Sequence, residues 1–356
     1  MLQPQLFRFV TDLLPAWCKP HRRVLALGVA GLLAKRRLTL TTVARGLPST
    51  CRIIHRVKRL WRFVNNPAVD PRTVTTALVA HALALRPTGW LPVILDDTSL
   101  KDRLTLLGAA IPYHGRALPL ALYSFAPQLL PHSLWRLREG LLALILAALP
   151  ADTRPRLLLV ADRGFAASHF FCRLIRTRIN FVIRVPRKVL LHMHHQSHSL
   201  EFLVAELQPG QRVFLTNVGY GPQRARLNLL LWWHPAHQEP WLLATTLPDA
   251  AQACRYYRLR MRIEAQFKDF KQQFRPVRSP LAGLEDCQLQ TRDRITRMCL
   301  LLLLALWVLA LRIRYPASWV RWITARGTLS FVSLALEWLD APPPIRTSLR
   351  QGRKSG

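Results

Sequence analysis

The first 85 residues have apolar positions spaced as on a helix, interleaved with basic ones. Thr39 to Arg45, a break at 46–48 and a segment from Ser49 to Val64 predict a helix, a turn and a second helix, with Ser49 as its N-cap. We expect the apolar side chains of the second helix to pack underneath it: Ile53, Ile54, Val57, Leu60, Trp61 and Val64. Its outer face would carry Arg52, Arg56, Lys58, Arg59 and Arg62. A basic helix after a short turn is a candidate for DNA binding, and a solvated charged face is the alternative.

Beyond residue 85 the pattern changes to short continuous apolar runs, which are typical of buried strands. The predicted order is strand, strand, strand, helix, strand, helix, strand, at Leu91–Leu95, Leu104–Ile111, Ala117–Phe125, Ser133–Ala148, Arg156–Ala161, Ala166–Arg176 and Phe181–Val185. This is the order of an RNase H-like α/β core. Between 186 and 249 the helical signal disappears, and strands are expected at Val213–Val218, Ala225–Trp233 and Trp241–Thr246.

The predicted fold class is therefore α/β, with an RNase H-like catalytic core, a mostly β insertion and an N-terminal helical DNA-binding domain. The predicted boundaries are 1–85 for the N-terminal domain, 86–185 and 250–315 for the two parts of the core, 186–249 for the insertion, 316–341 for a helical segment and 342–356 for a basic disordered tail. The apolar run from Met298 to Leu311 has 14 uncharged positions. A membrane span needs roughly 20, so we expect a buried core helix and no membrane partner.

Charge changes this picture most. The chain has 51 Lys and Arg against 19 Asp and Glu, a net charge of +32. An excess of this size indicates a polyanionic partner, most simply nucleic acid. A high-GC genome would explain part of the arginine excess, but not the scarcity of acids. The six cysteines are scattered without a Cys-x-x-Cys pair, which argues against a zinc ribbon or a disulfide framework and favours reduced thiols in the cytoplasm.

Three of the few acids stand at informative places. Asp96 ends the first predicted buried strand, Asp162 ends the fourth, and Glu264 lies on a predicted helix. Carboxylates from separate elements that meet at a sheet edge can hold two Mg²⁺ ions, which stabilise the attacking and leaving oxygens of a phosphoryl transfer. Asp96 could instead be a turn residue, and Asp162 could pair with Arg163. Asp97 competes with Asp96, because successive strand residues point to opposite faces.

The helix that carries Glu264 has a distinctive surface. On a continuous helix, Tyr257, Arg260, Glu264 and Lys271 fall within a stripe of about 60°. The apolar positions fall on the opposite side: Leu259, Ile263, Phe270 and Phe274. The pattern suits a carboxylate that holds a metal beside a polyanion. An amphipathic surface helix with ion pairs is the alternative.

Here the sequence resembles a known family. Tyr257-x2-Arg260-x3-Glu264-x6-Lys271 matches the YREK signature of bacterial DDE transposases of the insertion sequence four family. Ile94-Leu95-Asp96-Asp97-Thr98 is similar to the family's first-acid motif, and Asp162-Arg163-Gly164-Phe165 to its second. Further matches are 181–184, 241–246 and the basic stretch 56–67. The resemblance runs from about residue 40 to 280.

The resemblance implies a role for each matched residue. Asp96, Asp162 and Glu264 would bind two Mg²⁺ ions, for which Mn²⁺ could substitute. Tyr257, Arg260 and Lys271 would hold phosphates near the transposon end, Arg184 would contact end DNA, and Trp241 would stack on a flipped base. Packing in the β core is the alternative for Trp241, and Trp232 and Trp233 compete with it.

The family expectation is a DNA transposase that cleaves transposon ends and transfers a 3′-hydroxyl into target DNA by a cut-and-paste route. A homodimer would bridge two ends carrying inverted repeats, in the bacterial cytoplasm at the nucleoid. Two alternatives stay open: a metal-dependent nuclease, and an inactive DNA-binding protein on the same scaffold. The cluster of His192, His194, His195 and His198 does not have the spacing of a zinc site, and we expect a solvated loop there.

Overall fold

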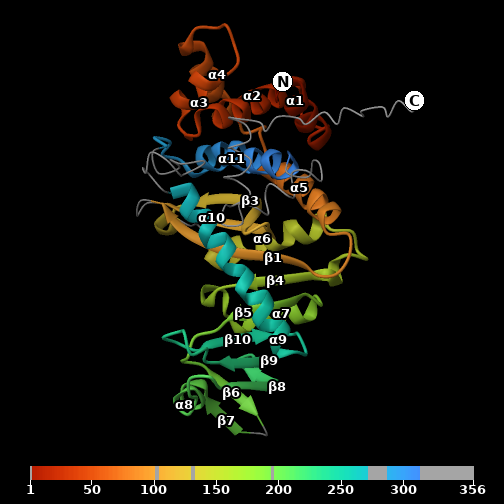
Figure 1. Ribbon diagram of the computed structural model, residues 1–356, viewed down its shortest axis with the longest axis vertical. Helices are drawn as coiled ribbons and strands as arrows, with labels where there is room; N and C mark the ends of the chain where they lie inside the picture. The colour runs from red at the N-terminus through yellow and green to blue at the C-terminus, as the bar shows by residue number, and fades with distance from the viewer. Residues whose placement is uncertain (1, 101–103, 130–132, 194–195, 272–286, 313–356) are drawn as a thin grey trace, which may run out of the picture.

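The computed structural model describes residues 2–100, 104–129, 133–193, 196–271 and 287–312. Figure 1 shows an elongated molecule, with helices at one end and the strands of a single sheet stacked along the rest of its length. The predicted helical segment 316–341 and basic tail 342–356 lie outside the described residues, and so does Phe274. The proposed domain boundaries stay predictions.

Helices alone form the N-terminal end: α1 (Leu2–Leu13), α2 (Lys19–Lys35), α3 (Leu40–Gly46), α4 (Ile53–Asn65) and α5 (Pro71–Leu85). Thr39 caps α3, since its side chain accepts a hydrogen bond from the backbone of Thr42. The prediction that Ser49 starts the next helix is wrong. α4 begins four residues later, because Ser49 instead accepts a bond from the backbone of Cys51 within the turn.

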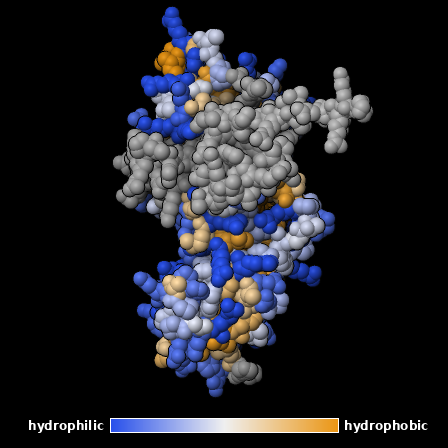
Figure 2. Space-filling model, viewed as in Figure 1, coloured by the Kyte–Doolittle hydropathy of each residue, from blue (hydrophilic) through white to orange (hydrophobic). Residues whose placement is uncertain are grey.

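The expected apolar face of α4 is only partly buried. Leu60, Phe63 and Val64 pack into the core, whereas 43% of Ile53, 52% of Ile54 and 41% of Trp61 is exposed. The prediction that these last three lie beneath the helix is therefore wrong. In Figure 2 this end of the molecule is mostly hydrophilic, with a few hydrophobic side chains among the polar ones.

Ten strands form one mixed sheet in the order β3-β2-β1-β4-β5-β10-β9-β8-β6-β7. The bounds are β1 Leu91–Leu100, β2 Leu104–Tyr113, β3 Arg116–Phe125, β4 Leu157–Ala161, β5 Asn180–Arg184, β6 Leu190–Met193, β7 Gln196–Ser199, β8 Arg212–Tyr220, β9 Ala225–Trp232 and β10 Trp241–Thr245. β1 pairs antiparallel with β2 and parallel with β4, and β4 pairs parallel with β5. Each predicted strand is present within a few residues of its expected place.

The strands of 186–249 extend this sheet, since β10 pairs antiparallel with β5. The segment also contains a short helix, α8 (Leu200–Ala205), that the sequence did not predict. Ser199 caps it and only Leu200 and Val204 are buried, so its six residues give little periodicity. The expected solvated loop is wrong for two of the histidines: His192 lies in β6 and His198 in β7, two antiparallel strands in which His192 is opposite Ser197 and His198 opposite Leu191. His194 and His195 lie outside the described residues.

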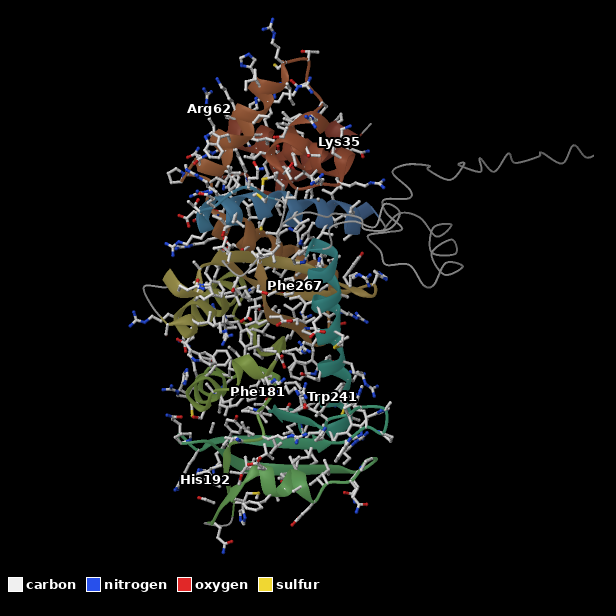
Figure 3. The ribbon with its side chains drawn as sticks, turned by 90° about the vertical axis from the view of Figure 1, so that its left-hand side faces the viewer. Lys35, Arg62, Phe181, His192, Trp241 and Phe267 are labelled. Carbon is white, nitrogen blue, oxygen red and sulfur yellow. The ribbon has the colours of Figure 1, made fainter. Side chains whose placement is uncertain are left out.

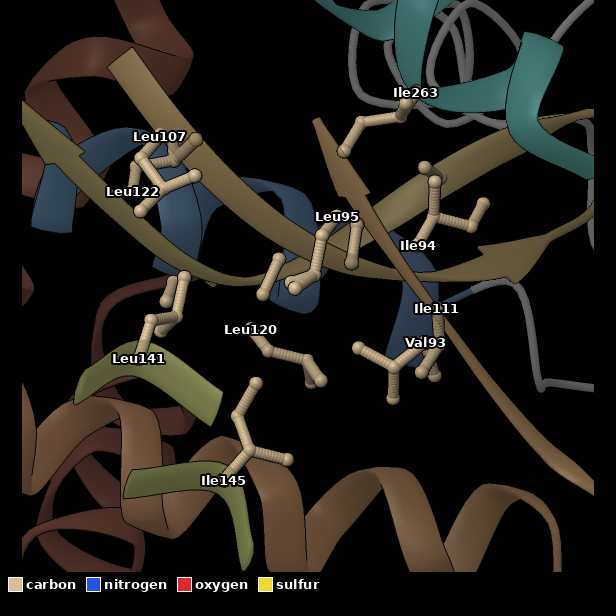
Figure 4. Packing of buried hydrophobic residues seen from close by; sticks show 14 of the residues in the cluster. Val93, Ile94, Leu95, Leu107, Ile111, Leu120, Leu122, Leu141, Ile145 and Ile263 are labelled. Atoms are coloured by element: carbon tan, nitrogen blue, oxygen red, sulfur yellow. The ribbon is translucent and has the colours of Figure 1, made fainter. Parts of the chain in front are cut away.

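The remaining helices cover the sheet: α6 (Leu134–Ala148), α7 (Ser168–Arg176), α9 (Ala250–Tyr257), α10 (Met261–Lys271) and α11 (Arg292–Arg312). Short 3₁₀ turns precede or separate them: η1 (Pro127–Leu129), η2 (Arg154–Arg156), η3 (Arg163–Phe165) and η4 (Arg258–Arg260). Figure 4 shows Ile263 of α10 on one side of the β1–β3 layer and Leu141 and Ile145 of α6 on the other. The two faces of β1 therefore meet different helices.

The apolar run after Arg297 is a core helix, as predicted. By length and composition Arg292–Leu311 could cross a membrane, but most of it is buried within the protein. α11 packs between β3 and the N-terminal helices (Figure 1). Trp307 Nε1 donates to the carbonyl oxygen of Pro119 at 2.7 Å, and the Tyr113 hydroxyl donates to that of Ala310 at 3.2 Å.

Candidate active site

Two carboxylates lie side by side where the parallel pairing of the sheet ends. The last paired residues of β1 and β4 are Leu95 and Ala161, and Asp96 and Asp162 directly follow them. The prediction that Asp96 ends its strand is wrong, because β1 goes on to Leu100. It continues to pair with β2, where Asp96 lies opposite Gly108. What ends at Asp96 is the pairing with β4, and this opens the sheet beside both acids.

Asp96 and Asp97 point to opposite faces of β1, as strand alternation requires. The Asp97 carboxylate meets α6, where Arg138 Nη2 donates to its Oδ2 at 2.7 Å. The Asp96 carboxylate meets the other face, with its Oδ2 at 3.6 Å from Arg260 Nη1. The backbone N–H of Asp97 also donates to Asp96 Oδ1 at 2.9 Å and helps to orient it. Asp96, and not Asp97, therefore faces Asp162 and Glu264.

The helix predicted to run unbroken from Tyr257 to Lys271 is interrupted. α9 ends at Tyr257, η4 follows and α10 begins at Met261. A 3₁₀ turn has 3.0 residues per turn instead of 3.6, so the predicted stripe is not continuous. Tyr257 is only 3% exposed and Arg260 7%. Ile263 and Phe270 pack into the core as predicted. The backbone stays helical through the turn, and the buried Arg260 side chain points toward the sheet edge.

The three predicted acids converge on the guanidinium of Arg260. Its Nη2 lies 2.6 Å from Glu264 Oε1. Its Nη1 lies 3.6 Å from Asp96 Oδ2 and 3.9 Å from Asp162 Oδ2. Residues 96, 162 and 264 come from β1, from the residue after β4 and from α10, so the fold brings distant parts of the chain to one point. One arginine faces three carboxylates here, which leaves an excess of negative charge in a strongly basic chain.

Burial shapes the ionisation of this cluster. Desolvation raises the pKa of Asp96 from its ordinary value of 3.8 to about 7, although the positive charge of Arg260 opposes the shift. Burial also raises the pKa of Tyr257 to about 12. For Arg260 burial disfavours the charged form, but Tyr257 and the three carboxylates outweigh it and raise the pKa of the guanidinium. Near neutral pH, Arg260 is therefore charged and Asp96 can gain or lose a proton.

The donor set suits a hard divalent cation. A cleft of about 340 Å³ is lined by Asp96, Asp97, Thr98, Asp162, Arg260, Glu264 and Phe267. Asp162 Oδ1 is buried and has no hydrogen-bond partner among the described residues. Carboxylate oxygens are the ligands that Mg²⁺ prefers. As the side chains lie, no three His, Cys, Asp or Glu residues of the described chain are close enough to share an ion. The guanidinium of Arg260 stands between the carboxylates, so a metal requires it to move.

A glycine allows α10 to lie close to the acids. Gly108 faces Asp96 across the β1–β2 pair. A Cβ atom added at Gly108 would lie 2.9 Å from Phe267 Cζ, closer than real Cβ contacts. Figure 3 shows Phe267 on the side of α10 that faces the sheet. A larger residue at 108 would force the Phe267 side chain, on the helix that carries Glu264, to shift.

Trp241, at the start of β10, lies beside Tyr257 in an aromatic group. Its ring centroid is 5.0 Å from that of Tyr257, at 75°, and 5.4 Å from that of His237, at 20°. Trp232 is 5.4 Å away, edge to face, and is buried. Trp241 is half-buried. Trp232 is therefore packed in the β core, whereas part of the Trp241 side chain is exposed.

The other predicted DNA contacts are more scattered. Arg184 ends β5 and pairs with Glu239 at 3.2 Å. Lys271 ends α10, and its side chain lies outside what the structure describes. On α4, Arg62 is exposed and Arg59 half-buried, and Arg52 is the exposed N-cap residue. Figure 3 shows Arg62 at the end of the molecule far from Trp241.

Arg56 is engaged by its own loop. Its guanidinium donates to the carbonyl oxygens of Cys51 at 2.7 Å, of Leu47 at 3.2 Å and of Ser49. These bonds fasten the turn between α3 and α4. Among the α4 arginines predicted to bind DNA, Arg56 is thus the one with a clear part in the local fold.

Sequence reasoning missed Arg138. It is 6% exposed and bonds both Asp97 and the carbonyl oxygen of Gly164, next to the two acid-bearing strand ends. No motif or spacing marks it, because it lies in an ordinary amphipathic helix. Only the folded structure brings it to the back of the site.

One comparison with protein families finds a match. Residues 138–308 match the family model of the transposase DDE domain. Over this range the chain is similar to a DDE-type transposase, which supports that family. The matched range includes Asp162 and Glu264, while Asp96 precedes it. A search of curated proteins finds no match to the chain. The domain supports a transposase-type function that acts on DNA.

Proposed function

We propose that this chain is a DNA transposase that cleaves transposon ends and joins their 3′-hydroxyls to target DNA, with Asp96, Asp162 and Glu264 as its catalytic residues. The observation that carries the proposal is the convergence of the three carboxylates on Arg260, within 2.6 to 3.9 Å. The strand order β3-β2-β1-β4-β5 supports an RNase H-like core, with the first acid on β1 and the second after β4.

Two Mg²⁺ ions, with Mn²⁺ as a substitute, would be held by Asp96, Asp162 and Glu264. Bound there, the metal would activate water or a 3′-hydroxyl and stabilise the leaving oxygen. The attacking oxygen forms a bond to phosphorus while the bond to the leaving 3′-oxygen breaks, so no oxidant or further co-reactant is needed. Asp96 must be ionised to act as a ligand. A carboxylate whose pKa is about 7 can release its proton near neutral pH.

Arg260 would change partners in this reaction. In the structure it faces three carboxylates. When divalent cations replace its charge, the guanidinium is free to bind a DNA phosphate, for which its planar fork is suited. Tyr257, Lys271 and Arg184 would add contacts to the transposon end, and Trp241 would stack on a flipped base. We assign the chain to the insertion sequence four family and to a hairpin cut-and-paste route on these residues.

The basic helix α4 would bind the inverted repeat at a distance from the chemistry. Figure 3 shows Arg62 and Trp241 far apart along the molecule, so one DNA end would lie along its length. A homodimer would hold two ends, in the bacterial cytoplasm at the nucleoid. Phosphate contacts from α4 would fix the register of the DNA against the carboxylates.

The test is the substitution Glu264→Gln with labelled transposon-end DNA and Mg²⁺. We expect strand cleavage to be abolished, because an amide is a poor ligand for a hard cation. End binding, measured in Ca²⁺, should stay within about twofold of wild type, since Glu264 carries no phosphate contact in the proposal. Cleavage at the wild-type rate would refute the mechanism. A second assay mixes pre-cut ends with plasmid: joined products indicate a transposase, whereas cutting without joining indicates a nuclease.

A further inference from the structure

We propose that Arg138 of α6 is a positioning residue that fixes the separation of the two acid-bearing strand ends. It touches neither Asp96 nor Asp162. It bonds instead the residue after Asp96 and a residue in the turn after Asp162, from the opposite face of the sheet. The inference rests on the proposed metal-dependent function and adds a residue to it.

The guanidinium of Arg138 spans the two strand ends. Its Nη2 donates to Asp97 Oδ2 at 2.7 Å, and its Nη1 donates to the carbonyl oxygen of Gly164 at 2.6 Å. Since a guanidinium is rigid and planar, two short bonds to it fix its two acceptors relative to each other. A lysine, with one nitrogen at its end, cannot copy this fork.

The surroundings hold Arg138 in place. The residue is 6% exposed. Its guanidinium carbon lies 4.1 Å from the ring centre of Phe165 and 5.1 Å from that of Trp135. Cation–π contacts strengthen when the cation is desolvated, as Arg138 is here. Phe165 belongs to η3, directly after Asp162, so the aromatic contact again ties Arg138 to the second acid.

The link through Arg138 lies beyond the last backbone pairing of β1 with β4. The parallel pairing of β1 and β4 ends at Leu95 and Ala161, one residue before each acid. Beyond that point the two segments diverge, and Arg138 connects them by way of Asp97 and Gly164. Metal ligands must be placed to within about 0.2 Å. Loss of the connection should therefore let the distance between Asp96 and Asp162 vary and weaken metal binding more than it weakens the fold.

The experiment compares Arg138→Lys and Arg138→Met with Arg173→Met. Arg173, on α7, pairs with Glu139 of α6 at 2.6 Å. This ion pair also involves α6 but does not lead to the acids, so its loss serves as a control, although Arg173 is more exposed than Arg138. We expect the Arg138 variants to need about 10-fold more Mg²⁺ for half-maximal cleavage. This is the low end of the loss seen when a group bonded to a metal ligand is removed, because Arg138 acts through the residues beside the ligands. The rise in melting temperature on adding Mn²⁺ should shrink in parallel. End-DNA affinity in Ca²⁺ should change less than about twofold.

Arg173→Met should lower the melting temperature and leave the Mg²⁺ requirement unchanged. If the Arg138 variants behave in the same way, Arg138 is only a structural residue and the inference is overturned. Should Arg138→Met fail to fold, Asp97→Asn weakens one of the two bonds and is expected to raise the Mg²⁺ requirement by a smaller factor; an unchanged requirement overturns the inference. A wild-type protein that neither responds to Mn²⁺ nor cleaves refutes the proposed function itself.

Discussion

Both faces of β1 place carboxylates against an arginine, but in different proportions. On the α6 face, one carboxylate meets one arginine: the half-buried Asp97 forms a short pair with Arg138, which is buried against the ring of Phe165. On the α10 face, three carboxylates meet one arginine, at distances from 2.6 to 3.9 Å. The first arrangement is balanced in charge, whereas the second has more negative charge than its arginine can neutralise.

This difference separates a structural ion pair from a candidate metal site. A buried pair that is balanced gains little from a further cation, since desolvation already costs about as much as the attraction returns. An unbalanced cluster of acids is stabilised by any added positive charge. In a chain of +32 the negative cluster cannot arise from general composition. The net charge of a cluster thus helps to distinguish a metal site from a structural ion pair, which a single acid or arginine cannot do.

The largest effect should come from removing one carboxylate on each face. Asp96→Asn is expected to reduce Mg²⁺-dependent cleavage about 1,000-fold or more, because it removes a ligand from the reacting centre. Asp97→Asn makes the same chemical change at the neighbouring residue, and it should lower cleavage far less at saturating Mg²⁺. Cleavage of labelled end DNA at several Mg²⁺ concentrations measures both. Equal losses in the two variants would mean that the faces do not differ in function.

The second effect is on stability and depends on metal. Arg260→Gln removes the cation that lies among the three acids, and loss of one partner from a buried ion pair costs about 3–5 kcal/mol. We expect a lower free energy of unfolding in EDTA, measured by urea denaturation, and a larger recovery with Mg²⁺ than in wild type. Arg255→Gln, an exposed change on α9, serves as the control. A variant as stable as wild type in EDTA would show that Arg260 does not serve as the counter-ion.

Much of this arrangement could be predicted from the sequence. The apolar runs of β1, β4 and β5 identify buried strands, and the acids stand directly after such runs or within a few residues of them. The long apolar helix α11 is also evident, since fourteen successive uncharged positions are too many for a surface helix. Its burial within the fold, and not its length or composition, distinguishes it from a membrane span. Period and burial are local properties, so local sequence carries them.

Other features could not be predicted, because they depend on partners far away in the chain. β1 extends past Asp96 only because β2 remains beside it. The 3₁₀ turn η4 interrupts the α-helical pattern just before Met261, and helical periodicity cannot signal such a change. The contacts of Arg138 could not be predicted, because they depend on how α6 packs against Asp97 and Gly164, which are distant in the sequence. The exposed Ile53, Ile54 and Trp61 show the reverse case, in which an apolar pattern predicted burial that the fold does not provide.

A smaller effect concerns pH. The pKa of Asp96 is about 7 in the folded chain against 3.8 ordinarily, and desolvation is the main cause. The folded state therefore holds more protons than the unfolded state between these values, so this contribution to stability is complete below about pH 4 and is lost as pH rises to about 7. The groups that act on Asp96 are Arg260, Asp162 and Asp97. Melting temperatures in EDTA across this range should fall less with pH in Asp96→Asn than in wild type.

The same pKa predicts that Mg²⁺ binds more tightly as pH rises from 6 to 8, since the ion must displace a proton from Asp96. Asp97→Asn should keep this dependence, because Asp97 lies on the face whose charge is already balanced. Isothermal titration in two buffers of different ionisation enthalpy counts the protons released. No proton release in wild type at pH 6.5 would contradict the assignment of Asp96 as a buried, partly protonated ligand.

The smallest effect tests two arginines of α4 that form no ion pair with an acid among the described residues. Arg62 is exposed on α4, whereas Arg56 bonds three carbonyl oxygens of its own loop. Arg62→Ala should weaken end binding modestly and reduce the slope of log affinity against log salt by about 1, because one phosphate contact is lost. Arg56→Ala should instead lower stability by leaving carbonyl groups without a donor. If Arg62→Ala leaves the salt dependence unchanged, exposure alone does not identify a DNA contact on this helix. An exposed arginine would then be a weaker guide to a functional site than the acid cluster is.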